Sequence, residues 1–377
     1  MIYTFYFLYF LGFVRSTIAF TNITMTPIKT IAVKNVLVWV WVAFLFLGHY
    51  LAWHAWSSGV FYYRAVAAVW FAFFPFLTLQ LIYKSVKEHY FGKPKKHEVV
   101  EIRDISAGLK PIPSRDLFEA PRHWLRRLGR HNDFFYPIFL EQTIYFKHLP
   151  PAFDGFTFLH ITDIHFRSGR WEAYYQQLLD WIIQLDTKVM FITGDFVSRR
   201  RDIPGCAAWL KKMAVKLEVY GILGNHDYWT SHHSVVEELT SAGVKMLVNE
   251  AVMLNRGRQQ VEIIGLDDRW KGRRTPKEIW GNKTFKIVLA HTPDHAKVIK
   301  KKGADFILSG HTHAGQIRFP VLGPIFIPSS SSRKFDRGYF RVGKKLLLYV
   351  NQGIGGTPPV RINCRPEVSK FVLRRER

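Results

Sequence analysis

Residues 158–166 constrain this chain of 377 residues more than any other stretch. Apolar residues that favour a strand lead directly into Asp163 and His165, which are separated by one position. Side chains alternate along an extended strand, so both polar groups would leave its end on the same side. A carboxylate and an imidazole held in this way are a typical pair of metal ligands. The stretch therefore predicts a buried strand that carries metal ligands at its carboxyl end.

Four more apolar segments further along the chain end in the same kind of residue. They cover 188–193, 219–223, 285–290 and 305–308. Helical patterns lie between the earlier of these predicted strands. The residues that follow these strands are Asp195; Asn225, His226 and Asp227; His291; and His311 and His313. Ligands of open α/β sheets gather at the carboxyl ends of strands, so residues far apart in sequence can meet there. We therefore expect an α/β domain with one metal centre.

The donor types narrow the choice of metal. Imidazole nitrogens and carboxylate oxygens suit manganese, iron or zinc, and the absence of thiolate ligands argues against a closed structural zinc site. The chain has only two cysteines, Cys206 and Cys364, which cannot form a disulfide framework and favour a reducing compartment. Taken singly, each motif is also typical of an ordinary polar turn. The metal interpretation rests on their joint occurrence.

The ordered series Asp-x-His, Gly-Asp, Gly-Asn-His-Asp, a single His and Gly-His-x-His resembles the calcineurin-like metallophosphoesterase superfamily. The similarity spans residues 156–373. Outside these motifs, 265–268, 289–294 and the tail 351–367 are similar to the bacterial YkuE/YaeI-type membrane-associated branch. The resemblance implies a fold of two packed mixed β-sheets flanked by helices, and metal-dependent hydrolysis of phosphoric esters or pyrophosphates.

The resemblance also implies a role for each residue. One metal ion would be bound by Asp163, His165, Asp195 and His313, and the second by Asp195, Asn225, His291 and His311. Asp195 would contribute to both sites. Two such ions make water nucleophilic at neutral pH and hold phosphate oxygens during in-line attack. His226 would protonate the leaving oxygen, and Asp227 would orient the ring of His226 and raise its pKa.

The N-terminal part of the chain is predicted to be embedded in a membrane. Residues 36–56 and 60–83 are apolar enough to cross a bilayer as helices, so 36–83 would form a transmembrane hairpin. The chain also contains 12 Trp and 31 Phe, many for a soluble protein of this size. Lysines flank both outer ends of the hairpin, which puts both ends on the cytoplasmic side. We expect a multi-pass protein of the cell inner membrane with its catalytic domain in the cytoplasm.

The rest of the chain divides into three predicted parts. Residues 1–35 form an N-terminal segment, in which an additional span and a true start at Met25 both stay open. Residues 84–154 form a basic juxtamembrane linker that is broken by prolines. A basic amphipathic stretch around Trp124 suits either anionic headgroups or a solvated surface. Residues 155–377 form the catalytic domain.

The charge balance predicts an anionic substrate. Lys and Arg number 53 against 29 Asp and Glu, which gives a formal net charge of +24. Arg199, Arg200 and Arg201 follow Asp195 closely in the chain. They are the candidate substrate-binding residues, because the planar guanidinium group can pair with phosphate through two hydrogen bonds.

We therefore expect a membrane-anchored phosphoesterase that hydrolyses a phosphodiester or phosphoanhydride with a lipid part. The bacterial branch includes enzymes that resemble UDP-2,3-diacylglucosamine hydrolases, so this lipid is the candidate substrate. A nuclease or general phosphodiesterase is the first alternative, since the positive charge also suits nucleic acid. The second alternative is a non-catalytic membrane-bound regulatory protein, which the complete set of predicted ligands disfavours.

Overall fold

The computed structural model describes residues 9, 12, 16, 31–91, 99–107, 109, 132–273, 277–281, 284–319, 323–324, 327–329, 332–343 and 345–376. The chain divides into two units, which we call the helical unit and the sheet unit. The helical unit comprises Met1–Phe91 with Pro320–Phe326. The sheet unit comprises Gly92–Phe319 with Ile327–Arg377.

The helical unit contains a helical hairpin. Helix α2 (Ile31–Ser57) and helix α3 (Phe61–Phe91) are joined by a turn in which Gly59 has a φ of 79°, a conformation that favours glycine. A Cβ on Gly48 would overlap the ring of Trp70, so the two helices approach each other closely at this position. Both helices run past the predicted limits of 36–83. The residues after 83 include Lys and Glu, which are themselves good helix formers.

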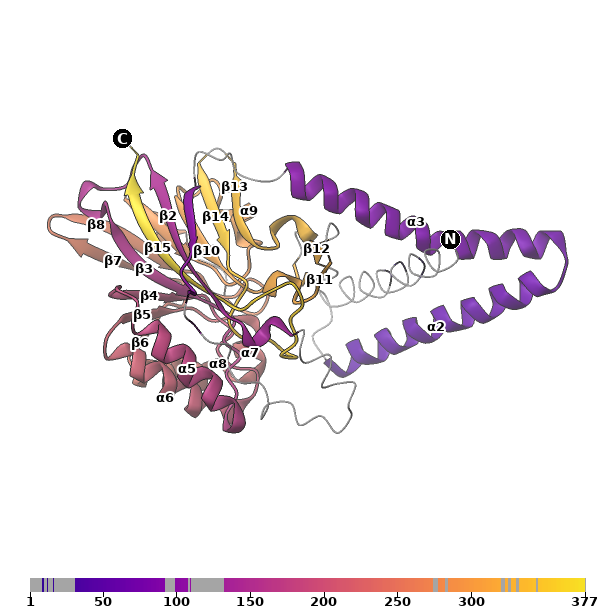
Figure 1. Cartoon of the computed structure of the whole chain (residues 1–377), viewed down its shortest axis with the longest axis horizontal. Coiled ribbons are helices and arrows are strands. Elements are labelled where there is room, and N and C mark those ends of the chain that lie inside the picture. Colours follow the sequence, from indigo (N-terminus) through magenta and orange to yellow (C-terminus); the bar gives the residue numbers. More distant parts are fainter. Residues whose placement is uncertain are drawn as a thin grey trace. The chain divides into compact units, whose positions relative to one another are not determined.

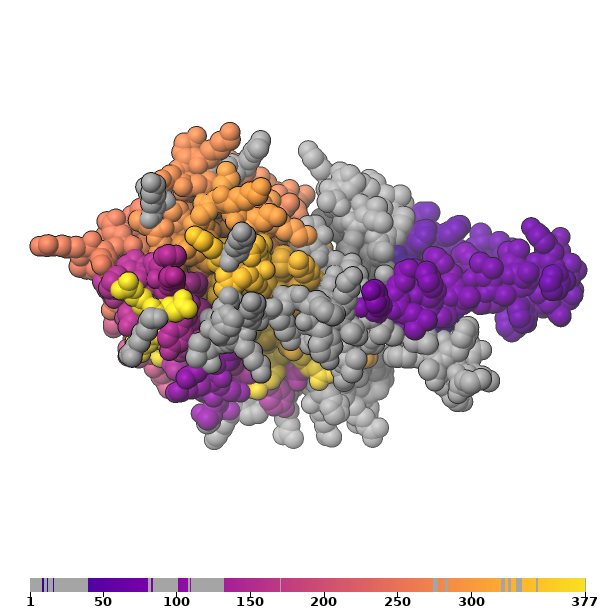
Figure 2. Space-filling model, turned by 90° about the horizontal axis from the view of Figure 1, so that it is seen from above, coloured from indigo at the N-terminus to yellow at the C-terminus, as the bar shows by residue number. Residues whose placement is uncertain are grey.

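The surface of this hairpin, indigo to violet in Figure 2, is rich in exposed apolar side chains. Trp53 and Phe61, for example, are 67% and 87% exposed. Among the described residues, one segment, Phe61–Gln80, is long and apolar enough to cross a membrane by length and composition. Residues 1–30, where an additional span stayed open, lie outside the described residues except for positions 9, 12 and 16.

Two mixed β-sheets form the centre of the sheet unit (Figure 1). In spatial order, the described strands of the first sheet are β1 (Val99–Asp104), β2 (Ile138–Phe146), β15 (Glu367–Arg375), β3 (Phe156–Ile161), β4 (Val189–Ile192), β5 (Glu218–Gly221) and β6 (Val244–Met246). Those of the second are β13 (Gly338–Val342), β14 (Leu346–Val350), β10 (Phe306–Ser309), β9 (Phe285–Leu289), β8 (Gln259–Gly265) and β7 (Glu250–Arg256). Buried side chains of both sheets share one core, including Phe158 and Phe191 from the first and Ile263 and Leu308 from the second.

Helices cover the outer faces of both sheets (Figure 1). Helices α5 (Glu172–Ile182), α6 (Ile203–Ala214) and α8 (His232–Ser241) pack on the first sheet, where Leu178 and Leu239 share a core with Ile192. Helix α9 (His295–Ile299) packs on the second, where Ile299 is buried with Ile307. The α/β fold with two mixed sheets and flanking helices is thus confirmed. The remaining elements are α7 (Asn225–Thr230), η1 (Asp133–Phe135), η2 (Pro151–Phe153), η3 (Gly169–Trp171), η4 (Arg200–Asp202), η5 (Glu278–Trp280), η6 (His313–Gly315), η7 (Ser332–Phe335), β11 (Arg318–Phe319) and, in the helical unit, β12 (Gly323–Pro324).

The first sheet begins earlier in the chain than the predicted catalytic boundary at 155. β1 and β2, within the segment expected to be a linker, pair with each other, and β2 runs parallel to β15. β2 does not show a clean apolar alternation because Gln142 is buried in it. Side chains of Tyr339, Tyr349 and Ser369, all distant in sequence, hydrogen-bond this amide. The amphipathic stretch around Trp124 lies outside the described residues.

Parallel pairing aligns the strand ends that the sequence singles out. Ile161, Ile192 and Gly221, the last residues of β3, β4 and β5, lie side by side in the first sheet. In the second sheet, Leu289 at the end of β9 pairs with Leu308 of β10. The loops that follow neighbouring strands therefore start next to one another. This alignment lets polar groups from separate parts of the chain meet.

Candidate metal centre

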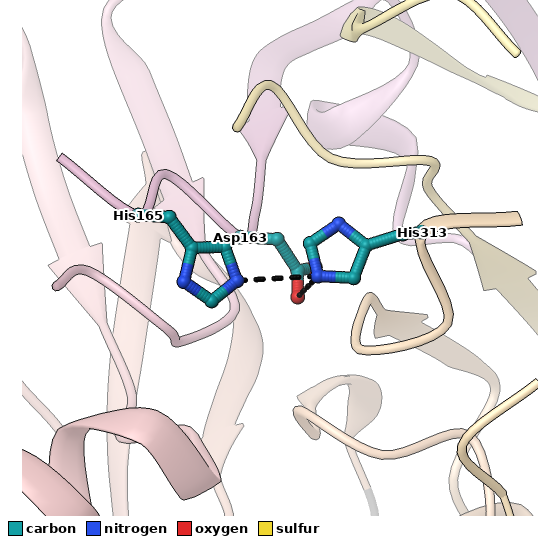
Figure 3. A group of neighbouring side chains, drawn as sticks. All are labelled: Asp163, His165 and His313. Atoms are coloured by element: carbon teal, nitrogen blue, oxygen red, sulfur yellow. Dashed lines mark hydrogen bonds and ion pairs between the residues drawn. The ribbon is translucent and has the colours of Figure 1, made fainter. Parts of the chain in front are cut away.

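Three side chains from the loops after β3 and β10 face one another (Figure 3). Asp163, His165 and His313 offer ligand atoms that lie within 4.8 Å of one another. Nε2 of His313 lies 3.2 Å from Nε2 of His165 and 3.3 Å from Oδ1 of Asp163. All three residues have φ values between 44° and 50°. Residues other than glycine seldom adopt this left-handed conformation, and it is concentrated at functional sites.

A second group forms after β4, β9 and β10. Asp195, His291 and His311 also offer ligand atoms within 4.8 Å of one another. Nε2 of His291 lies 3.1 Å from Oδ1 of Asn225, the first residue of α7, and 3.1 Å from Nδ1 of His311. The residues predicted to bind the second ion are thus brought together.

Asp195 faces both groups. Its Oδ2 lies 3.6 Å from Nε2 of His165 and 3.4 Å from Nε2 of His291, so one carboxylate oxygen reaches a histidine of each group. Its Oδ1 accepts the backbone N–H of His226 at 2.8 Å, which orients the carboxylate. A Cβ on Gly224 would overlap this carboxylate, so the loop can approach only with glycine at that position. This placement suits a residue that contributes to two metal sites.

The protonation states of three histidines of the centre fit metal binding. Burial lowers the pKa of His165 and of His311 to about 3, and that of His313 well below its usual value. These rings are therefore neutral, with nitrogen lone pairs available to a cation. Within the part of the chain that the structure describes, Oδ1 of Asp163 and Nε2 of His311 are buried without a hydrogen-bond partner. Buried polar atoms are costly when they remain unpaired, and a bound cation would satisfy them.

The carboxylates of the centre attract positive charge. Burial acts to lower the pKa of His291, but the carboxylates of Asp195, Asp163 and Asp268 outweigh it and raise this pKa to about 10. Burial also raises the pKa of Asp163 to about 6. Bound metal cations would supply the positive charge that these buried carboxylates favour. The oxygen and nitrogen donors, without a thiolate among them, fit manganese, iron or zinc.

Neighbouring groups orient several of the candidate ligands. Nδ1 of His291 donates to the carbonyl of Thr193 at 2.6 Å, which leaves Nε2 facing the centre. The backbone N–H of His311 donates to Oδ2 of Asp163 at 2.8 Å, which leaves Oδ1 free to bind a cation. Such contacts outside the ligand shell fix the tautomer and the direction of a metal ligand.

Asp227 does not orient the ring of His226, contrary to the expectation from the sequence. Its Oδ2 accepts the backbone N–H groups of Asp195 and Gly224, each at 2.9 Å, and its Oδ1 accepts that of Phe196 at 2.9 Å. Asp227 lies in the first turn of α7, where an acidic side chain reaches back to free N–H groups. The pKa of His226 is lowered, chiefly by burial, rather than raised. Burial raises the pKa of Asp227 itself to about 8.

Ser198 contacts the ring that Asp227 was expected to orient. Its Oγ lies 2.7 Å from Nδ1 of His165 and 3.2 Å from Nδ1 of His226. One hydroxyl therefore joins a candidate metal ligand to the candidate proton donor. Sequence analysis missed this residue, because a serine in a loop has no pattern that distinguishes such a role from an ordinary turn.

Arg361 is a second residue whose place only the structure revealed. It is fully buried, and its Nη2 donates to the carbonyls of Gln352 at 2.9 Å and Gly353 at 3.0 Å. The same nitrogen lies 3.5 Å from Nδ1 of His313. The tail of the chain therefore packs behind a candidate ligand, which gives a physical reason for the motif at 351–367.

The three candidate substrate-binding arginines are exposed on the surface. In the sequence they follow Asp195 and Ser198 of the centre. Arg199 directly follows Ser198, and its Nε donates to Oδ2 of Asp202 at 2.8 Å. Arg200 and Arg201 are exposed in η4. Contact between these side chains and a phosphate stays a prediction.

A protein-family model described as "Calcineurin-like phosphoesterase" matches residues 156–315. This interval runs from the start of β3 through η6. It contains all the side chains of the two ligand groups.

Several curated proteins are similar to this chain. Phosphodiesterase YaeI of Escherichia coli (strain K12) is 29% identical over 223 residues, covering 58% of this chain and 82% of the relative. A transmembrane protein with metallophosphoesterase domain of Danio rerio is 31% identical over 259 residues, covering 63% and 57%. The UDP-2,3-diacylglucosamine pyrophosphatase LpxG of Chlamydia muridarum (strain MoPn / Nigg) is 25% identical over 275 residues, covering 57% and 82%.

Proposed function

This chain belongs to the calcineurin-like phosphoesterase family and is a metal-dependent phosphoesterase, and from this premise we propose that it is membrane-anchored and hydrolyses a lipid-linked phosphodiester or phosphoanhydride. The observation that carries the proposal is the position of Asp195, whose carboxylate reaches a buried histidine of each ligand group. Such a centre is suited to the hydrolysis of a phosphoric ester or anhydride.

The candidate ligands divide into two sets that share Asp195. Asp163, His165 and His313 with Asp195 would hold one ion, and Asn225, His291 and His311 with Asp195 would hold the other. Manganese, iron and zinc all suit these donors. When bound, such ions make water nucleophilic at neutral pH and neutralise charge on the phosphate oxygens.

His226 is the proposed proton donor to the leaving oxygen. Its backbone N–H is held by Asp195 and its ring by Ser198, so its position relative to the ligand groups is set by hydrogen bonds. Asp227 contributes by holding the backbone of the loop after β4. Arg199, Arg200 and Arg201 would bind the charged part of the substrate that extends away from the reacting phosphate.

The helical unit is the proposed membrane anchor. Its exposed aromatic and aliphatic side chains suit a lipid environment, and Phe61–Gln80 is long enough to span it. The similarity to a transmembrane relative from Danio rerio supports this assignment. We place the protein in the cell inner membrane as a multi-pass protein, with the sheet unit on the cytoplasmic side, because lysines flank both outer ends of the hairpin.

UDP-2,3-diacylglucosamine is the proposed substrate. It combines a phosphoanhydride with acyl chains, and the similarity to LpxG supports it. A nuclease or general phosphodiesterase is the second candidate, which the net charge of +24 and the similarity to YaeI support. The intact donor set disfavours a purely regulatory protein.

The test uses the full chain purified in detergent and supplied with Mn²⁺. Turnover of UDP-2,3-diacylglucosamine is compared with turnover of single-stranded DNA and of bis-p-nitrophenyl phosphate, with Asp195→Asn as the inactive control. We expect the lipid to give the highest kcat/KM. A higher kcat/KM for DNA would make a nucleic acid the proposed substrate in place of the lipid. If neither the lipid nor DNA is hydrolysed, the lipid proposal loses its support.

A further inference from the structure

Two exposed tryptophans stand beside the candidate metal centre. Trp229, in α7, is 50% exposed, and its ring centroid lies 4.6 Å from that of His226. Trp270, in the loop after β8, is 39% exposed, and its ring centroid lies 4.7 Å from that of His311. The other described tryptophans of the sheet unit are buried or partly buried. Each exposed indole thus adjoins a side chain of the centre.

Hydrogen bonds link the two segments that carry these rings. The hydroxyl of Tyr228, next to Trp229 in α7, donates to Oδ1 of Asp267 at 2.6 Å. In the same loop as Asp267, Oδ1 of Asp268 accepts the backbone N–H of Trp270 at 3.0 Å. The backbones that carry the two indoles are therefore held in place before a substrate binds. Binding to preorganised groups loses less conformational entropy.

The surroundings of the indoles favour a flat partner over a flexible chain. Lys271 and Arg273 are exposed or partly exposed in the loop that carries Trp270, and His232 stacks on Tyr228 at 4.5 Å between ring centroids. An acyl chain would need an enclosed apolar channel, whereas a planar ring needs only one aromatic face and tolerates polar groups at its edges. Stacking on an exposed aromatic side chain is the usual way in which proteins bind unpaired bases.

We propose that Trp229 and Trp270 bind the nucleobase of a nucleotide-containing substrate whose phosphoryl group lies at the metal centre. The proposal deepens the proposed function and rests on it, because the uracil of a UDP-linked lipid is such a base. It assigns two residues to substrate selection that neither the strand-end motifs nor the ligand groups include. The aromatic pair would distinguish nucleotide esters from simple alkyl phosphates.

The test measures binding, so that it does not depend on turnover. Uridine monophosphate and ribose 5-phosphate differ only in the base, and their dissociation constants are measured by calorimetry with the Mn²⁺-loaded full chain in detergent. Stacking contributes about 1–3 kcal/mol per base, so the double variant Trp229→Leu/Trp270→Leu should weaken binding of the nucleotide by about 5- to 150-fold. Binding of ribose 5-phosphate should change by less than about twofold, since a phosphate contact does not need the indoles.

Matched variants separate stacking from structural damage. Trp229→Tyr and Trp270→Tyr keep an aromatic face and should retain most of the nucleotide affinity. Tyr145→Leu removes an aromatic side chain of β2 that is 37% exposed and should leave both affinities unchanged.

Three results with these two ligands would overturn the proposal: no binding of uridine monophosphate to the wild type, no change in the double variant, or equal losses for both ligands. Octyl phosphate is measured in the same way as a probe for an acyl-chain site. A loss of affinity confined to octyl phosphate would also overturn the proposal. The proposed function is judged separately. Base-dependent binding without hydrolysis of UDP-2,3-diacylglucosamine would contradict the lipid substrate and leave the aromatic pair assigned.

Discussion

Replacing His226 by Ala should remove the proposed proton donor while leaving the ligand groups in place. The hydrogen bond from residue 226 to Oδ1 of Asp195 comes from the backbone N–H, which alanine keeps. The ring contacts with Ser198, Trp229 and His165 are lost, but none of the side chains in the two ligand groups is changed. We therefore expect the variant to fold and to bind as much metal as the wild type, measured by atomic absorption after dialysis.

The size of the rate loss should depend on the leaving group. Proton donation contributes about 10²- to 10⁴-fold, equivalent to about 2.7–5.5 kcal/mol of transition-state stabilisation. An alkoxide needs this proton as the P–O bond breaks, whereas p-nitrophenolate is stable without it. With thymidine 5′-phosphate esters of methanol and of p-nitrophenol, His226→Ala should lower kcat by this factor for the methyl ester. For the aryl ester we expect a loss below about tenfold.

His233→Ala is the matched control. His233 is an exposed histidine of α8 whose ring lies tilted against that of His232, so its removal should leave both rates unchanged. Equal losses for the two esters would show that His226 does not donate the proton. Near wild-type rates for both would remove it from the reaction, and a loss of bound metal would assign it to assembly of the centre.

Three further predictions concern the construction of the centre. Asp195→Asn removes the negative charge that both ligand groups face, and the metal bound per chain should fall at least by half. Gly224→Ala places a Cβ against the backbone and carboxylate of Asp195, so Tm and metal content should both fall. Burial lowers the pKa of His160 to about 3, so below about pH 6.5 the unfolded chain binds a proton that the folded chain does not. The free energy of unfolding should therefore decrease as the pH is lowered. His160 should contribute about 2 kcal/mol of this decrease between about pH 7 and pH 5, measured by urea denaturation.

Each of these predictions has its own control. Glu237→Gln changes a carboxylate of α8 outside the ligand groups and should leave the metal content at the wild-type value. Gly281→Ala, where the nearest atom to a new Cβ lies at 3.4 Å, should not change Tm. His160→Gln can keep the hydrogen bond to Thr193 and should lose its share of the pH dependence. An unchanged pH profile in that variant would mean that other groups cause the acid instability.

The hydrophobic pattern, together with the residue types at the strand ends, was enough to place the candidate ligands. Each of Asp163, Asp195 and His291 follows a run of buried residues, and the end of a buried strand is a local property of the sequence. Parallel pairing of neighbouring strands then aligns these ends, which is a general rule of α/β sheets. The residues of both ligand groups were therefore predictable from strand positions and residue types.

The strands β1 and β2 were not predictable in this way. The buried amide of Gln142 breaks the apolar alternation of β2, and its partner Ser369 is 227 residues away in sequence. A buried polar residue looks like a surface residue until its partners are known. The extent of the first sheet was therefore decided by long-range pairing.

Residue type and spacing determined which side chains of this protein could serve a metal centre, because a strand end presents its side chains in a direction set by local geometry. Which group contacts which was decided only by the tertiary structure. Asp227 follows His226 directly yet binds backbone N–H groups, while Ser198 from another loop contacts the ring of His226. Adjacency in the chain does not set the direction of a hydrogen bond in a loop, because the bond depends on where the neighbouring loops come to lie.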